Sequence, residues 1–272
     1  MTHHTKTTLP LSNKSLGNEE SISLISNSPS LQYYLFLPKS LSPSSKILIC
    51  VHGISRNAKQ QITTFHQKAL KSDYIIIAPY FSKESHKGYQ RLKTNSAGET
   101  SADALNRVLS EVRQKHSITT NNFTLFGYSG GGQFAHRYAM AYPKNINKLV
   151  VCSAGWFTFP TPNKYFPYGV KAHKNSPPKI KENLHLFLQL KIFVIVGELD
   201  NIYDLGLNQK ERINRQQGYH RFERATRWVR SIQEKCNSMH IPSDLRFITL
   251  KGCGHSFLDC ERFGGISKFI FD

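Results

Sequence analysis

Residues 124–140 read TLFGYSGGGQFAHRYAM, and the stretch changes character at its middle. It is apolar and β-prone up to Phe126, and after the glycines it takes up the spacing of a helix. Ser129 stands at the change, between Gly127 and Gly131, in the pattern G-x-S-x-G. Glycines at these positions remove the Cβ atoms that would collide in a sharp turn from a strand into a helix. The stretch therefore predicts that Ser129 is presented at the tip of such a turn.

Composition places the chain among ordinary globular proteins. Of its 272 residues, 39% are hydrophobic and 20% are charged, which is enough apolar material for a full core. No stretch approaches the roughly 20 apolar residues that a membrane-spanning helix needs. Residues 1–30 are rich in Ser, Thr and Asn without a continuous apolar run. We therefore expect a flexible tail there, no secretory signal and a cytoplasmic location.

On both sides of the serine turn, short β-prone runs alternate with longer amphipathic ones. The expected strands are 32–38, 46–53, 73–79, 122–129, 147–155, 191–200 and 245–252, and the expected helices are 58–72, 99–116, 130–143, 219–236 and a short final one. Such alternation predicts an α/β fold with a mostly parallel central sheet and helices on both faces. Residues 156–184 are irregular and longer than a normal connection. They predict a cap-like insertion, either a lid or a substrate-binding segment.

Four chemically suggestive residues follow expected strands. Ser129 follows TLFGY, His52 follows ILICV, Asp200 follows FVIVGEL and His255 follows FITLKGCG. In an open parallel sheet, ligands bind beyond the carboxyl ends of the strands. We therefore expect these four side chains at one edge of the sheet.

From about residue 31 to residue 272 the chain resembles the α/β-hydrolase superfamily. The catalytic order of that family is Ser, then Asp or Glu, then His, and Ser129, Asp200 and His255 stand in that order. VHGISRNA is similar to the family's oxyanion loop, and KGCGHSF is similar to its histidine loop. Within the superfamily the chain most resembles the polyhydroxybutyrate-depolymerase and polyester-esterase branches. The resemblance implies an α/β-hydrolase domain over 31–272 that hydrolyses ester bonds.

Each predicted catalytic residue has a chemical reason. A serine hydroxyl such as that of Ser129 is a poor nucleophile, so a base must take its proton. His255 is the expected base, because imidazole as a side-chain type ordinarily titrates near neutrality. Asp200 would hold the imidazole in the correct tautomer. Glu198 competes for this role, but the G-x-x-D spacing from Gly197 favours Asp200.

The expected oxyanion hole consists of the backbone N–H groups of Gly130, next to the nucleophile, and of Ile54. His52 is expected to border the substrate site and to shape the oxyanion loop rather than transfer a proton. In the branch that the chain resembles, a tryptophan after the corresponding strand lines the substrate cleft, which makes Trp156 a candidate wall. Tyr128 is another, although local aromatic packing would explain Trp156 equally well. A second loop, 80–100, carries basic residues and would close the other side of the cleft.

The net charge of +18 raises the question of nucleic-acid binding. Because the basic residues are spread along the chain rather than gathered in one arm, we expect a solvated basic surface and no specific nucleic-acid partner. The five cysteines are too few for a disulfide framework, and pairing of Cys253 with Cys260 stays open. No metal-binding motif is present, so we expect neither a metal nor another cofactor.

These features favour a serine hydrolase that cleaves carboxylic esters through an acyl-enzyme, acting on a small-molecule or polymeric ester. Two alternatives remain: a peptidase of the prolyl-oligopeptidase type, and a hydrolase fold that binds without catalysis. The sequence does not specify the oligomeric state.

Overall fold

The computed structural model describes residues 22–25, 31–173, 176–177 and 179–272. In the described residues, eight strands form one sheet in the order β1-β2-β4-β3-β5-β6-β7-β8. The strands are β1 (Ser23–Ile25), β2 (Gln32–Phe36), β3 (Lys46–Val51), β4 (Tyr74–Tyr80), β5 (Phe123–Tyr128), β6 (Ile146–Cys152), β7 (Lys191–Gly197) and β8 (Leu245–Leu250). The pairings of β1 with β2 and of β2 with β4 are antiparallel, and all other pairings are parallel.

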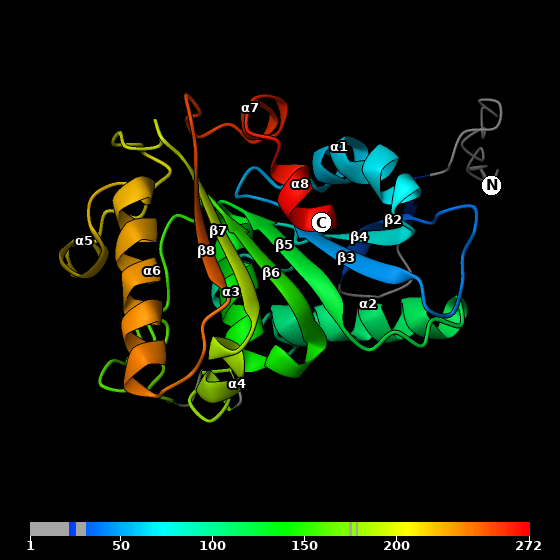
Figure 1. Cartoon of the computed structure of the whole chain (residues 1–272). Helices are drawn as coiled ribbons and strands as arrows, with labels where there is room; N and C mark the ends of the chain where they lie inside the picture. The colour runs from blue at the N-terminus through cyan, green and yellow to red at the C-terminus, as the bar shows by residue number, and fades with distance from the viewer. Residues whose placement is uncertain (1–21, 26–30, 174–175, 178) are drawn as a thin grey trace, which may run out of the picture.

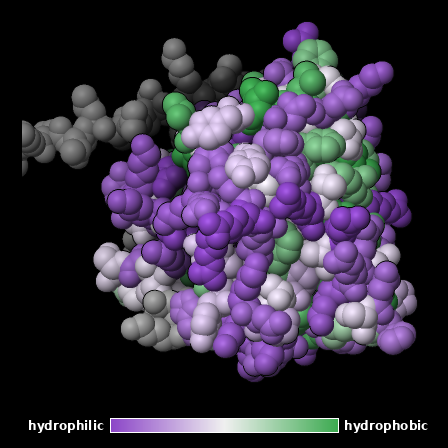
Figure 2. All heavy atoms as spheres, turned by 90° about the vertical axis from the view of Figure 1, so that its left-hand side faces the viewer, coloured by the Kyte–Doolittle hydropathy of each residue, from purple (hydrophilic) through white to green (hydrophobic). Residues whose placement is uncertain are grey.

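Helices cover both faces of this sheet (Figure 1). The helices are α1 (Ala58–Lys71), α2 (Ser101–Lys115), α3 (Gly130–Ala141), α4 (Leu184–Leu188), α5 (Glu211–Gln217), α6 (Arg221–Ser238), α7 (Phe257–Arg262) and α8 (Ile266–Phe271), with short 3-10 turns η1 (Tyr89–Arg91) and η2 (Pro143–Asn145). Helices α1, α7 and α8 lie on one face, and α2, α3 and α6 lie on the other (Figure 1). The face of the molecule that carries α5 and α6 is mostly hydrophilic (Figure 2).

The two faces have separate apolar cores because neighbouring side chains of a strand point to opposite sides. In β3, Ile47 and Ile49 belong to the core under α2, α3 and α6. Leu48 and Cys50 belong to the core under α1, α7 and α8. A strand buried on both faces needs a nearly continuous apolar run, which is why KILICV reads as one.

The predicted parallel sheet with helices on both faces is thus confirmed, with two differences. Ser23–Ile25, inside the expected flexible tail, forms the edge strand β1, while the rest of 1–30 lies outside the described residues. The chain ends in two helices, α7 and α8, where one short helix was expected. No helix of the described residues is both long and apolar enough to cross a membrane.

The described residues of the insertion at 156–184 lie between the end of β6 and the start of β7, which are neighbouring strands. Its first residue, Trp156, lies near the carboxyl ends of the strands, beside Ser129. Near its other end, Asn183 donates a side-chain hydrogen bond to the carbonyl of Ala141, at the end of α3. The described part of the insertion therefore runs along the layer of α3, and its role as a lid stays a prediction.

Candidate active site

The turn between β5 and α3 presents Ser129 as the sequence predicts. Ser129 has φ 53° and ψ −111°, a conformation that strains any residue with a side chain. A Cβ atom on Gly127 would lie 2.2 Å from the Gly131 carbonyl oxygen. A Cβ atom on Gly131 would lie 1.8 Å from the carbonyl oxygen of Val51, at the end of β3. Only glycine fits at these two positions, because Gly127 packs against the backbone of the turn itself and Gly131 packs against the end of β3.

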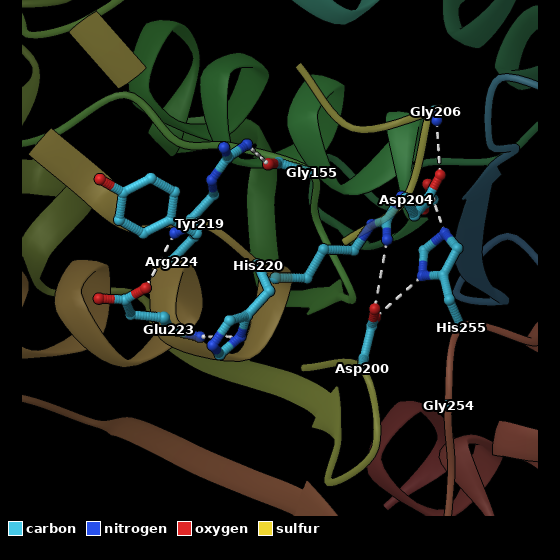
Figure 3. A network of polar contacts seen from close by, with 12 residues as sticks. Gly155, Asp200, Asp204, Gly206, Tyr219, His220, Glu223, Arg224, Gly254 and His255 are labelled. Atoms are coloured by element: carbon cyan, nitrogen blue, oxygen red, sulfur yellow. Dashed lines mark hydrogen bonds and ion pairs between the residues drawn. The ribbon is translucent and has the colours of Figure 1, made fainter. Parts of the chain in front are cut away.

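Three side chains form a continuous chain of hydrogen bonds beyond the carboxyl ends of the parallel strands. Ser129 Oγ lies 3.1 Å from Nε2 of His255. Nδ1 of His255 lies 2.9 Å from Oδ2 of Asp200, whose carboxylate points toward the imidazole ring (Figure 3). These contacts fit a neutral histidine whose Nδ1–H donates to the carboxylate, which leaves Nε2 free to accept from the hydroxyl.

The carboxylate of Asp200 is fixed from its other side. Its Oδ1 lies 3.3 Å from Nη1 of Arg221, and both side chains are almost fully buried. Arg221 also forms an ion pair with Asp204. A buried carboxylate needs such partners to stay charged. Arg221, which the sequence analysis did not single out, therefore holds the Asp200 carboxylate in place.

Glu198, the competing carboxylate, faces a different group. Its Oε2 accepts a hydrogen bond from the backbone N–H of Gly252 at 3.0 Å. It thus ties the end of β7 to the loop that carries His255. A Cβ atom on Gly197 would lie 2.2 Å from the Cys253 carbonyl oxygen, so the two loops touch at this point as well.

The two predicted oxyanion donors lie side by side. Gly130 begins α3, where the first backbone N–H groups have no partner within the helix. A Cβ atom on Gly130 would lie 3.2 Å from the backbone nitrogen of Ile54. The hydroxyl of Tyr89 donates to the carbonyl of His52 at 2.8 Å, which holds the loop before Ile54 against this turn.

His52 is almost completely buried and is not among the residues that line the space around Ser129. Its Nε2 accepts from the Phe81 N–H at 3.0 Å, and its Nδ1 lies 2.8 Å from the Gly53 carbonyl oxygen. Burial lowers the pKa of His52 to about 4, so the ring is neutral near pH 7. The structure therefore places His52 where it shapes the loop, and it does not bring this side chain to the expected substrate site.

Tyr128 and Trp156 both border the site and are both largely buried. The ring of Tyr128 stacks on that of His255, with centroids 5.3 Å apart. Trp156 lies under the guanidinium of Arg137, whose central carbon is 4.2 Å from the centroid of its ring. Tyr128 thus supports the histidine, and Trp156 packs on a buried cation while lining a hollow beside Ser129.

Two hollows meet at Ser129. The first has a volume of about 280 Å³ and is lined by Tyr128, His255 and Phe257, among others. The second, which we call the basic hollow, has a volume of about 360 Å³; its lining includes Lys87, Arg91, Trp156, Lys210 and Arg221.

Residues 201–210, between β7 and α5, contribute to both hollows through Gly206. The sequence analysis assigned no role to this segment. Arg224 holds it in place, because Nη2 of this buried side chain donates to the Asn208 carbonyl and Nη1 donates to the Gly155 carbonyl. The sequence feature that could have indicated a role for this segment is the long stretch without helical or strand periodicity after Asp200.

A larger hollow, of about 640 Å³, lies at the amino ends of the parallel strands, away from Ser129. Lys46, Lys148 and Lys191 line it. Lys148 donates to the carbonyl of Ile270 and so caps the end of α8.

The five cysteines are all buried and unpaired, so Cys253 and Cys260 form no disulfide.

A model of the α/β hydrolase fold matches residues 46–184, about half of the chain. The chain therefore belongs to the α/β-hydrolase family. Its sequence is also 20% identical to the bifunctional acetylxylan esterase/xylanase XynS20E of Neocallimastix patriciarum over 123 residues. This match takes in 44% of the chain but only 17% of that enzyme.

Solved structures with the same fold include two enzymes of similar length. Poly(aspartic acid) hydrolase-1 from Sphingomonas sp. KT-1 superimposes with a TM-score of 0.78 and 20% identity, covering 93% of this chain and 97% of that one. LpqC, a poly(3-hydroxybutyrate) depolymerase from Bordetella parapertussis, gives a TM-score of 0.76 and 22% identity, covering 92% and 95%. At this level of identity the likeness concerns the fold.

Proposed function

We propose that the chain is a serine hydrolase that cleaves carboxylic esters through an acyl-enzyme. The observation that carries this proposal is the chain of contacts from Ser129 through His255 to Asp200, at 3.1 and 2.9 Å. A hydroxyl, an imidazole and a carboxylate in this order form the arrangement that activates a serine nucleophile.

In the first half of the reaction, Ser129 Oγ attacks the ester carbonyl carbon while Nε2 of His255 takes the hydroxyl proton. The carbonyl oxygen becomes an oxyanion, which the N–H groups of Ile54 and Gly130 would bind. One such donor typically stabilises the transition state by about 3–4 kcal/mol. The C–O bond of the ester then breaks, the alcohol leaves with the proton from His255, and the acyl group stays on Ser129.

In the second half, water takes the place of the alcohol. His255 removes a proton from the water as its oxygen attacks the acyl carbon. The second oxyanion is bound by the same two N–H groups. When it collapses, Ser129 leaves and takes back the proton from His255. The Asp200 carboxylate stabilises the imidazolium that forms in each half.

The comparisons support an ester as the bond that is cleaved. The similar proteins include an acetylxylan esterase and a poly(3-hydroxybutyrate) depolymerase, both of which carry ester chemistry in their names. Because the identities are low, this support extends to the class of bond and not to a particular alcohol or acid.

The test is hydrolysis of para-nitrophenyl acetate and butyrate by the wild-type chain and by Ser129→Ala. We expect turnover by the wild type and a loss of at least about 10³-fold in kcat for the variant, with an unchanged thermal melt. Hydrolysis by the variant at the wild-type rate would overturn the proposal.

A parallel panel of amide and peptide substrates separates the alternatives. Faster cleavage of prolyl peptides than of matched esters would favour a peptidase. No turnover of any substrate, together with no reaction of Ser129 with a fluorophosphonate, would favour a fold that binds without catalysis.

A further inference from the structure

The charged side chains that line the basic hollow are all positive. Its described lining contains the cationic side chains of Lys87, Arg91, Lys210 and Arg221 and no carboxylate. Lys87 and Arg91 come from the segment after β4, whereas Lys210 comes from the segment before α5. The positive side chains therefore approach the hollow from two separate segments of the chain.

Three of these cations, all on exposed side chains, have no counterion among the described residues. Arg221 is neutralised by its ion pairs with Asp200 and Asp204. Among the described residues, no ion pair and no hydrogen bond engages the side chain of Lys87, Arg91 or Lys210. A concave surface with unpaired charges of one sign focuses its potential and attracts ions of the other sign.

A further cation lies behind the wall of the hollow. Arg137 is completely buried, and its Nη1 donates to the carbonyls of Gln90 and Gln133, two residues that line the hollow. Its Nε donates to the hydroxyl of Thr158. Its Nη2 is buried and has no hydrogen-bond partner among the described residues. No ion pair of the described residues involves this guanidinium.

A buried guanidinium without a carboxylate is unfavourable for the unliganded protein. Burial, followed by the nearby charge of Arg91, lowers the pKa of Arg137, which means that its positive charge costs free energy in this environment. An anion in the hollow would offset this cost for Arg137 and Arg91 together.

We propose that the basic hollow binds a carboxylate carried by the substrate, so that the preferred substrates are anionic esters. This inference rests on the proposed esterase function and adds a substrate class to it. The hollow borders Ser129, so the carboxylate would lie a few bonds from the reacting carbonyl. Its volume of about 360 Å³ is many times that of a water molecule, roughly 30 Å³, so it can hold a side arm of the substrate.

Two isosteric pairs of esters test the proposal. The first pair, meta-acetoxybenzoate and meta-acetoxybenzamide, carries the charge on the leaving group. The second pair, para-nitrophenyl hydrogen adipate and its primary amide, carries it on the acyl group. At neutral pH and low salt, we expect kcat/KM to favour the carboxylate in at least one pair by about tenfold, and added salt to reduce this preference.

The triple variant Lys87→Gln, Arg91→Gln, Lys210→Gln tests whether these cations cause the preference. We expect it to lose most of the preference through a higher KM for the carboxylate. Lys115→Gln is a control for the loss of an exposed charge away from the hollow, because Lys115 is the last residue of α2 and does not line the hollow. Its preference should equal that of the wild type.

Equal rates for both members of both pairs, or a preference that survives in the triple variant, would overturn the inference while leaving the esterase proposal intact. A readout that needs no ester hydrolysis is protection of Ser129 from a fluorophosphonate. Adipate should slow labelling more than adipamide in the wild type but not in the triple variant. Equal protection by the two compounds in the wild type would also contradict a carboxylate site.

Discussion

The imidazole of His255 lies on the ring of Tyr128, with the ring centroids 5.3 Å apart and the planes inclined by only 24°. The Tyr128 hydroxyl is buried and has no hydrogen-bond partner among the described residues. The contribution of Tyr128 to the site is therefore the face of its ring, which limits the positions that His255 can take.

We expect Tyr128→Phe to keep kcat within about twofold of wild type, because removing an unpaired hydroxyl keeps the stacked ring. Tyr128→Ala should lower kcat roughly 10- to 100-fold, because the imidazole is then free to move away from Ser129. Steady-state kinetics with a short neutral ester measure both effects. Equal losses for the two variants would show that the hydroxyl, rather than the ring, matters.

The roles of the two carboxylates after β7 can be separated by amide substitutions. Asp200 contacts His255, so Asp200→Asn should lower kcat about 10⁴-fold by favouring the wrong tautomer of the imidazole. The Glu198 carboxylate instead accepts a hydrogen bond from the Gly252 backbone, so Glu198→Gln should lower kcat about tenfold or less. Rates at saturating ester decide between them. A larger loss for Glu198→Gln would identify Glu198 as the residue that orients His255.

The glycines of the serine turn should differ sharply from other glycines in their tolerance of a methyl group. A Cβ atom on Gly131 would lie 1.8 Å from the Val51 carbonyl oxygen, whereas one on Gly254 would have no atom within 4 Å. We expect Gly131→Ala to lower the free energy of unfolding by about 3 kcal/mol or more. Gly254→Ala should change it by about 0.5 kcal/mol at most. Urea unfolding measures both values, and a stable Gly131→Ala variant would contradict the packing of this turn.

The buried ring of His52 should make stability depend on pH. The pKa of His52 falls from 6.5 to about 4 on folding, so between these values the unfolded chain binds a proton that the folded chain does not. Stability should therefore fall as the pH falls through this window. For His52 alone, the loss from about pH 6.5 to about pH 5 is about 1.5 kcal/mol.

His52→Gln removes the titrating group, so its stability should depend less steeply on pH than that of the wild type, whatever its stability at neutral pH. His240→Gln, an exposed substitution, is the control. Urea unfolding at several pH values gives the slopes. Identical slopes for wild type and His52→Gln would mean that His52 is not held neutral by the fold.

The elements that the sequence predicted best are those whose pattern is local. The glycines around Ser129 and the apolar runs of the parallel strands carry their own signal, so the serine turn and the sheet were predicted within a few residues. The order of the strands along the chain then brought Ser129, Asp200 and His255 to one edge, as the resemblance implied.

The features that the sequence analysis missed depend on contacts between distant residues. The position of 201–210 depends on Arg224, whose guanidinium joins Asn208 to Gly155. The pairing of Arg221 with Asp200 joins the start of α6 to the end of β7. The edge strand β1, three residues long, is too short for an alternating pattern to reveal.

The central claim, that Ser129 is the nucleophile, is tested most directly by locating the site of covalent modification. After reaction with a fluorophosphonate, digestion and mass spectrometry should find one adduct, on the peptide that contains Ser129. His255→Ala should react far more slowly, since the hydroxyl then lacks its base. An adduct on another residue, or full labelling of Ser129→Ala, would contradict the account.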